Sequence, residues 1–142
     1  MSQVRVSTAA EEILAYCRPW HERKGTTCFD SYAEMVIFSA GLGFSKAGRR
    51  RPKSAVDFLS QPNPIAVDVF KSQQLYPIML LLALAVTKDN QIAKDEKRIC
   101  AILEDFAEIG FRELKKVLDQ SNPQEFHIEL GRLVAETKTI KI

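Results

Sequence analysis

The stretch from Asp95 to Asp119 carries a helical repeat that commits a large part of the chain to helix. Its apolar residues recur at intervals of three and four, which places them on one face of an α-helix. They are Ile99, Ile102, Leu103, Phe106, Gly110, Leu114, Val117 and Leu118. We expect a solvent-exposed face from the charged residues between them, which are Lys97, Arg98, Glu104, Asp105, Glu108, Glu113, Lys115 and Lys116. With Asp95 as its N-cap, the stretch predicts one long helix with a single buried side.

A second strong helix signal begins at Ser31. Ser31 and Glu34 form a capping box, and the residues that follow, up to Gly43, are apolar on nearly every side of a helix. Such a helix is usually central to a hydrophobic core. We expect Gly43 to end it in the left-handed conformation, with Phe44 folding back as the apolar contact of that C-cap.

Three further segments predict helices. Thr8 and Glu11 form a capping box that would start the first helix of the chain. The apolar run 78–86 follows Pro77, a residue that fits the first turn of a helix, and predicts a helix buried in the core. The last helix is expected to begin at Asn122-Pro123. Its apolar side carries Phe126, Leu130, Leu133 and Val134.

The region between the second helix and the apolar run is less regular. Residues 45–64 contain three prolines, which discourage continuous helix. Ile65–Phe70 alternates roughly and is β-branched, which predicts a short strand. That strand needs a partner, either Val4–Val6 or a second subunit.

These signals together predict a mainly α fold. At 142 residues the chain is long enough to bury a real core without disulfides or metal. We expect a compact single helical domain over 1–142, with about five helices and at most a short strand pair. Residues 1–7 and 137–142 are expected to be frayed tails.

Composition indicates a cytoplasmic protein. The three cysteines form no disulfide framework, and free thiols fit a reducing compartment. The first residues lack the apolar core of a signal peptide, and the longest apolar run has nine residues, where a membrane span needs about 20. The net charge of +2 is unevenly distributed: residues 1–54 carry 9 Lys/Arg against 5 Asp/Glu, whereas residues 55–142 carry 11 against 13.

The sharpest local feature is a basic cluster that follows the second predicted helix. It consists of Lys46, Arg49, Arg50, Arg51 and Lys53. No acidic residue lies between Glu34 and Asp57 to neutralise these charges. Such a cluster is typical of a surface that meets phosphate or an acidic partner. Aromatic residues are not interleaved with it, so a stacking platform for single strands is not expected, and Phe38 and Phe44 are assigned to the core.

Motifs for catalysis or for a cofactor are not found in the sequence, so we expect no enzyme activity and no cofactor. There is no G-x-S-x-G, no P-loop and no G-x-G-x-x-G. The spacing of Cys17, His21 and Cys28 is a poor match to zinc sites, which usually show paired short spacings. Carboxylates such as Asp57, Asp68 and Glu113 leave a small metal-dependent nuclease open as an alternative.

The stretch from Phe29 to Leu118 resembles a known family, the small dnd system-associated proteins, also called DNA phosphorothioation-associated protein 4. The resemblance rests on FDSYAEMVIFSAGLGF, the basic GRRRP and the segment that ends in Asp68-Val69-Phe70. It continues through LLALAVTKD, DEKR and DFAEIGFREL. The regions around Cys17–His21 and beyond Pro123 have no counterpart in this resemblance, and Ile65–Phe70 lacks a tryptophan associated with that segment.

The resemblance implies association with bacterial systems that replace a phosphate oxygen of DNA with sulfur, or that restrict DNA lacking this mark. It implies no catalytic residue. We therefore expect a non-catalytic accessory protein that binds DNA, phosphorothioated or plain, or another protein of the system, through the basic cluster. A pure protein–protein adaptor is the alternative. A further alternative is a homo-oligomer in which the acidic second part of one copy meets the basic cluster of another.

Overall fold

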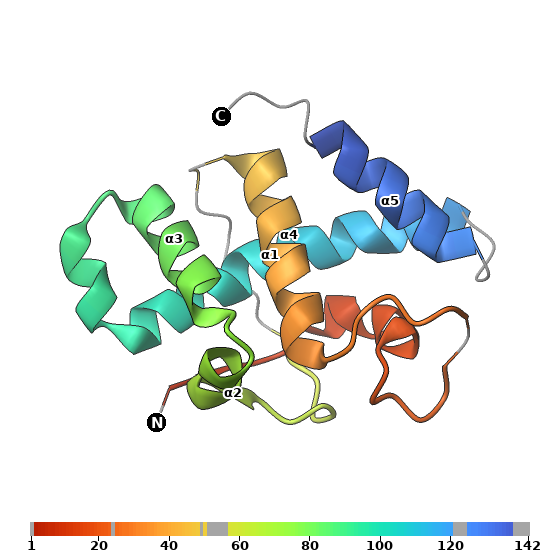
Figure 1. Ribbon diagram of the computed structural model, residues 1–142, viewed down its shortest axis with the longest axis horizontal. Helices are drawn as coiled ribbons and strands as arrows, with labels where there is room; N and C mark the ends of the chain where they lie inside the picture. Colours follow the sequence, from red (N-terminus) through yellow and green to blue (C-terminus); the bar gives the residue numbers. More distant parts are fainter. Residues whose placement is uncertain (1, 24, 49, 51–56, 121–124, 138–142) are drawn as a thin grey trace.

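Two long helices, α1 (Tyr32–Ala47) and α4 (Glu96–Gln120), cross at the centre of the molecule (Figure 1). The computed structural model describes residues 2–23, 25–48, 50, 57–120 and 125–137. Helices α3 (Tyr76–Thr87) and α5 (Phe126–Thr137) lie on opposite sides of α1, and the short α2 (Val67–Ser72) precedes α3. The 3₁₀ helices are η1 (Thr8–Ala10), η2 (Ile13–Tyr16) and η3 (Asn90–Lys94). The predicted mainly α fold with five α-helices is confirmed for this part of the chain.

The predicted strand pair is present but shorter than expected. Strand β1 (Gln3–Val4) pairs antiparallel with β2 (Ile65–Ala66), with Val4 opposite Ile65. The chain then turns into α2 at Val67, so the predicted strand over Ile65–Phe70 is wrong in its second half. The reason is packing: Val67 and Phe70 are both buried, and residues three apart share a helical face, whereas they would point to opposite faces of a strand.

The first predicted α-helix is replaced by two short 3₁₀ helices. Ser7, and not Thr8, is the N-cap of η1, and its Oγ accepts a hydrogen bond from the backbone N–H of Ala9 at 3.1 Å. After η2 the backbone carbonyl of Tyr16 accepts from the N–H of Cys28 at 2.8 Å. This pairing with a distant segment ends the helical path there. Tyr16 also anchors α5, because its ring lies 4.5 Å from that of Phe126.

The crossing of α1 and α4 is a backbone-to-backbone contact made at two glycines. A Cβ placed on Gly110 would lie 1.8 Å from the carbonyl oxygen of Ser39, and one on Gly43 would lie 2.0 Å from that of Phe106. Gly43 is therefore inside α1, and its predicted role as the C-cap is wrong. The helix continues for one more turn to Gly48, which has a φ of 65° and closes it.

The charged side of α4 is not uniformly exposed, contrary to expectation. Glu104 and Asp105 are only 7% and 4% exposed. Both oxygens of Glu104 accept hydrogen bonds from the Arg5 guanidinium, at 3.0 and 3.1 Å, and Oε2 also accepts from the Arg5 backbone N–H at 2.6 Å. Ser7 donates a hydrogen bond to Glu108 one turn further along. These contacts attach the N-terminal segment to α4, which explains how a charged helix face can be covered.

The glycine contact between α1 and α4 gives a first prediction. Gly110→Ala should lower the free energy of unfolding by about 3 kcal/mol or more, because overpacking of this kind must push a backbone away. Gly131→Ala on α5 is the matched control, since nothing lies within 4 Å of the added methyl group. That change should stabilise the protein by up to about 1 kcal/mol through helix propensity. Urea unfolding of the three proteins measures the difference, and equal stabilities would contradict the close contact.

The contact between Arg5 and Glu104 gives a second prediction. Arg5→Ala should cost about 2 kcal/mol of unfolding free energy, because a buried carboxylate then loses its charged donors. Arg18 is a matched control: it also pairs with a carboxylate, but both side chains are about two-thirds exposed. Arg18→Ala should cost under about 1 kcal/mol. Chemical denaturation of both variants is the measurement. A larger loss of unfolding free energy from Arg18→Ala than from Arg5→Ala would show that burial does not determine the size of the loss.

Candidate interaction surface

The basic cluster begins at the C-terminal end of α1. Of its five residues, Lys46 lies in the last turn of the helix and Arg50 follows the C-cap, and both side chains are exposed. Arg49, Arg51 and Lys53 lie outside the residues that the structure describes. The unpaired carbonyl groups at a helix C-terminus favour nearby cations. The position is therefore electrostatically suited to concentrated positive charge.

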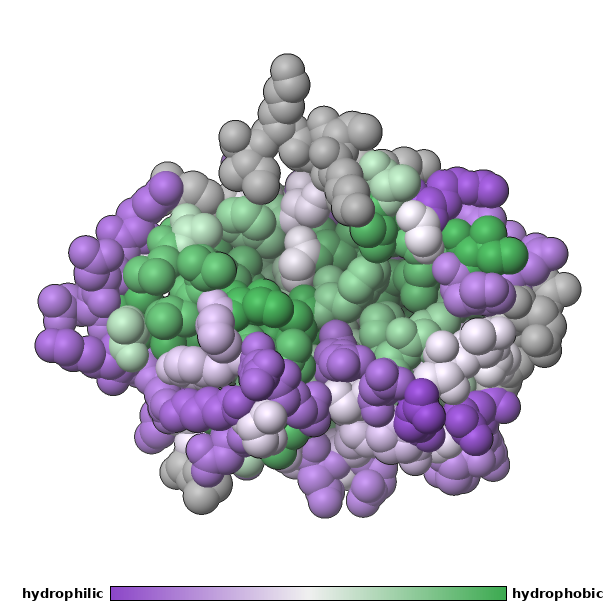
Figure 2. All heavy atoms as spheres, in the orientation of Figure 1, coloured by the Kyte–Doolittle hydropathy of each residue, from purple (hydrophilic) through white to green (hydrophobic). Residues whose placement is uncertain are grey.

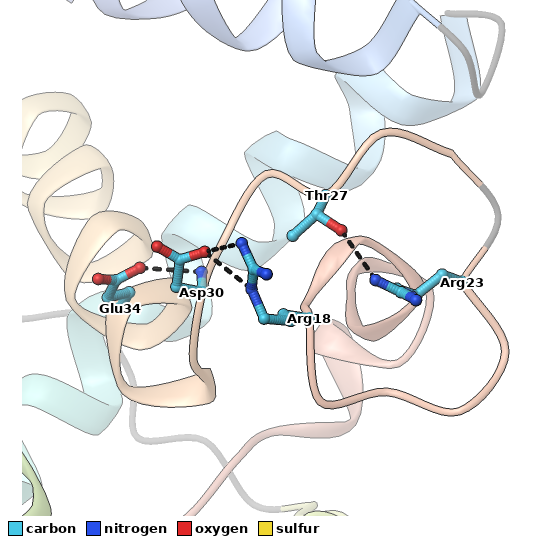
Figure 3. A network of polar contacts seen from close by, with 5 residues as sticks. All are labelled: Arg18, Arg23, Thr27, Asp30 and Glu34. Atoms are coloured by element: carbon cyan, nitrogen blue, oxygen red, sulfur yellow. Dashed lines mark hydrogen bonds and ion pairs between the residues drawn. The ribbon is translucent and has the colours of Figure 1, made fainter.

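Other basic side chains of the first part of the chain are held by local partners, in contrast to the cluster. Arg18 donates to Asp30 Oδ1 at 2.8 Å, and Arg23 donates to Thr27 Oγ1 at 3.4 Å (Figure 3). These contacts hold the loop between η2 and α1. Within the described part of the chain, neither Lys46 nor Arg50 forms an ion pair. Among the described residues, Arg5 and Arg18 are thus paired with carboxylates, whereas the charges at the end of α1 are not.

The aromatic residues near the cluster belong to the packing of α1, as predicted. The ring of Phe44 lies 5.9 Å from that of Phe106 on α4. The ring of Phe38 lies 5.5 Å from that of Phe29. Both side chains are partly buried against the core. They are not arranged as a platform on which nucleobases stack.

The carboxylates considered for a nuclease come from separate elements. Asp57 lies in the segment before β2, Asp68 lies in the first turn of α2, and Glu113 lies on α4, where it accepts a hydrogen bond from Lys116 at 3.2 Å. Among the residues that the structure describes, no three His, Cys, Asp or Glu side chains are grouped so that they could hold a metal ion. The geometry therefore gives the nuclease alternative no support.

The cysteines near the N-terminus are packed as apolar side chains. Cys17 is fully buried, and its Sγ lies 3.5 Å from the Sδ of Met35. Burial raises the pKa of the Cys17 thiol to about 12 and that of Cys28 to about 11. His21 is exposed and its ring lies 4.8 Å from that of Trp20. Both thiols are consequently protonated at neutral pH.

The feature that sequence reasoning missed is the exposure of α3. The helix predicted over 78–86 is present within α3, but its predicted burial in the core is only partial, because Met79 and Ala83 are the fully buried residues of α3. Ile78 is 48% exposed and Leu81 is 66% exposed. Among the described elements, α4, η3, α1 and α2 contact α3, and Ile78 and Leu81 lie on the side that these elements leave exposed. None of the described helices is long and apolar enough to span a membrane.

The exposed side of α3 belongs to a broader apolar face. Figure 2 shows hydrophobic residues gathered over α3, α1 and α5, with hydrophilic residues below and at the edges. A groove of about 240 Å³ lies between α3 and α1, and another of about 250 Å³ lies between α1 and α5. Gly41 lines both grooves. We call this surface the α3–α1–α5 face. Large apolar patches of this kind mark interaction sites.

Comparison with known proteins gives one result. The family model described as DNA sulphur modification system-associated protein 4 matches residues 3–139. The match extends beyond the resemblance seen in the sequence motifs, since it includes the N-terminal segment and α5. No curated protein and no solved structure gives a significant match.

The buried thiols give a third prediction. At pH 8 a thiol with a pKa of about 11 is about 100-fold less ionised than one with the ordinary pKa of 9.0. Cys28, the most accessible of the three thiols, should therefore react with a maleimide or disulfide reagent about 100-fold more slowly in the native protein than in urea. The native rate should keep rising from pH 8 to pH 10, whereas that of the unfolded chain levels off. Rapid native labelling at pH 8 would contradict the assigned environment.

Proposed function

Because the chain belongs to the DNA sulphur modification system-associated protein 4 family, we propose that it is a non-catalytic, cytoplasmic accessory protein of such a system that binds DNA through the basic end of α1. The family description supports a role in association with the modification system. Direct binding of DNA goes beyond that description and is the new part of the proposal. The phosphates of a duplex are the ligands that a cluster of arginines and lysines recognises best.

The observation that carries the proposal is the contrast between engaged and free positive charge. Arg5, Arg18 and Arg23 are bound to side chains of the same molecule, whereas Lys46 and Arg50 are exposed and make no ion pair within the described residues. Three more basic residues lie next to them in the sequence, and no acidic residue intervenes. Clustered positive charge that the fold itself does not use is the best candidate for contact with an external partner.

DNA binding is tested by fluorescence anisotropy with one duplex, in plain and in phosphorothioated form, over a series of salt concentrations. Binding should weaken steeply with salt, because each phosphate contact releases counterions. The variant Arg49→Ala/Arg50→Ala/Arg51→Ala should lower the slope of log K against log salt by about 2 to 3. A difference between the two duplexes would add recognition of the sulfur mark to the function.

The matched control is Lys94→Ala/Lys97→Ala/Lys115→Ala. This variant also removes three positive charges, but from exposed positions on η3 and α4 that form no ion pair within the described residues. Binding should be nearly unchanged. Equal losses in the two triple variants would mean that overall charge, and not the cluster, drives binding. Incubating the duplex with the protein and Mg²⁺ tests the nuclease alternative at the same time, since cleavage would contradict a non-catalytic role.

A protein–protein adaptor is a second candidate function, and the α3–α1–α5 face favours it. Absence of DNA binding at low salt, together with co-purification of other proteins of the system, would establish the adaptor in place of the DNA-binding protein. Loss of that co-purification in a variant of the apolar face, but not in the arginine variant, would assign the face as the contact.

A further inference from the structure

The outer side of α3 is unusual for a helix at the surface of a protein. None of its twelve residues is charged, and Leu81 at its middle is 66% exposed. A helix that is apolar on all sides is normally enclosed by other elements. Within the described residues, however, α3 packs on α4, on η3 and on part of α1, and its remaining side is open. The helix therefore forms an apolar ridge along one edge of the α3–α1–α5 face.

The other half of the face contains an apolar groove, between α1 and α5, into which an apolar ridge could fit. The groove between α1 and α5 is lined by apolar residues and glycine, apart from Ser45. Its floor includes Gly41, where a Cβ would meet nothing within 4 Å. A glycine at an exposed helix position allows another backbone or a bulky side chain to approach closely. One chain thus carries both an apolar ridge and an apolar groove on a single surface.

The face is also large enough for a specific contact. A helix of twelve residues is about 18 Å long, and three neighbouring helices spaced by about 9 Å span roughly 30 Å. Multiplying this length by this width gives roughly 500 Å² of projected surface on each copy, or roughly 1,000 Å² for the two copies together. This value reaches the lower limit for a specific protein–protein interface.

We infer that the α3–α1–α5 face binds the same face of a second copy of this chain. The α3 ridge of each copy lies in the groove between α1 and α5 of the other, and the two α1 helices meet at Gly41, close to the two-fold axis. A contact of this isologous type requires a surface that is complementary to itself, and a ridge and a groove on either side of α1 meet that requirement. Among the residues that the structure describes, no charged side chain lines either groove, so two identical faces meet without repulsion or buried unpaired charge from these residues.

This inference does not depend on DNA binding, because the basic end of α1 lies outside both grooves. It also differs from an oligomer in which acidic residues of one copy meet the basic cluster of another. Such an oligomer would dissociate in high salt, whereas an apolar contact would persist or strengthen.

Sedimentation equilibrium over a range of protein concentrations is the direct test. The wild-type protein should reach twice its monomer mass of 16.0 kDa, and high salt should not dissociate it. Leu81→Glu should raise the dissociation constant of the dimer by about tenfold or more, because the contact would bury a charge. Gly41→Leu, which places a bulky side chain at the position shared by both grooves, should have the same effect without adding charge.

The matched control is Ile128→Glu, which places the same charge at an apolar position of similar exposure. Ile128 is 53% exposed on α5 and lines neither groove. The dimer should survive this change. A wild-type protein that stays monomeric at every concentration would overturn the inference. So would a dimer that is disrupted by Ile128→Glu but not by Leu81→Glu. Circular dichroism of each variant confirms that its helices are intact.

Discussion

The contact between α1 and α4 at Gly43 and Gly110 determines where the other elements can lie. Two helices that touch through their backbones leave no room for side chains at the crossing, and both protrude on either side of it. Helix α4 is the longer of the two, so α3 and η3 pack on its first half and α5 packs beyond the crossing (Figure 1). The N-terminal segment covers α4 through Arg5 and Glu104. With these places occupied, the side of α1 that faces away from α4 is not covered by the other described elements, which produces the α3–α1–α5 face between α3 and α5.

As a result of this arrangement, some charged side chains hold the fold together and others form no such contact within the described residues. Glu104 and Glu108, two of the acidic residues in the second part of the chain, accept hydrogen bonds from Arg5 and Ser7 and hold the N-terminal segment. They are not free to attract a second molecule. The exposed Lys46 and Arg50 have no comparable role within the described residues. These two acidic residues therefore contribute to folding, whereas the basic end of α1 is the part that we propose binds an external partner.

Local signals in the sequence predicted much of the fold. Features that depend on which other element of the chain a helix packs against were not predicted. The N-cap at Ser31 is confirmed, because Ser31 Oγ accepts from the Glu34 N–H at 3.1 Å, while the Glu34 carboxylate accepts from the N–H of Asp30 at 2.9 Å and not from that of Ser31. Asp95 caps α4, and Pro77 lies in the first turn of α3. These interactions form within one or two turns, so residue type and spacing suffice to predict them. Gly43 was misread because a glycine near the end of an apolar run has the same appearance whether it closes a helix or packs against another one. Burial of Glu104 depends on Arg5, 99 residues away in the sequence, and no local pattern encodes that pairing.

The position of α3 was missed for a related reason, and that reason bears on what the protein does. An apolar run predicts that a helix will be covered, but it does not say whether the cover comes from the same chain. In this fold α1 contributes to both candidate surfaces: its middle, at Gly41, belongs to the apolar face, and its end carries the basic residues about 9 Å further along the axis. Salt acts on the two in opposite directions, since screening weakens phosphate contacts while apolar contacts are kept. A protein that lost its DNA in high salt and remained associated with its partner would thus be using the two parts of α1 independently.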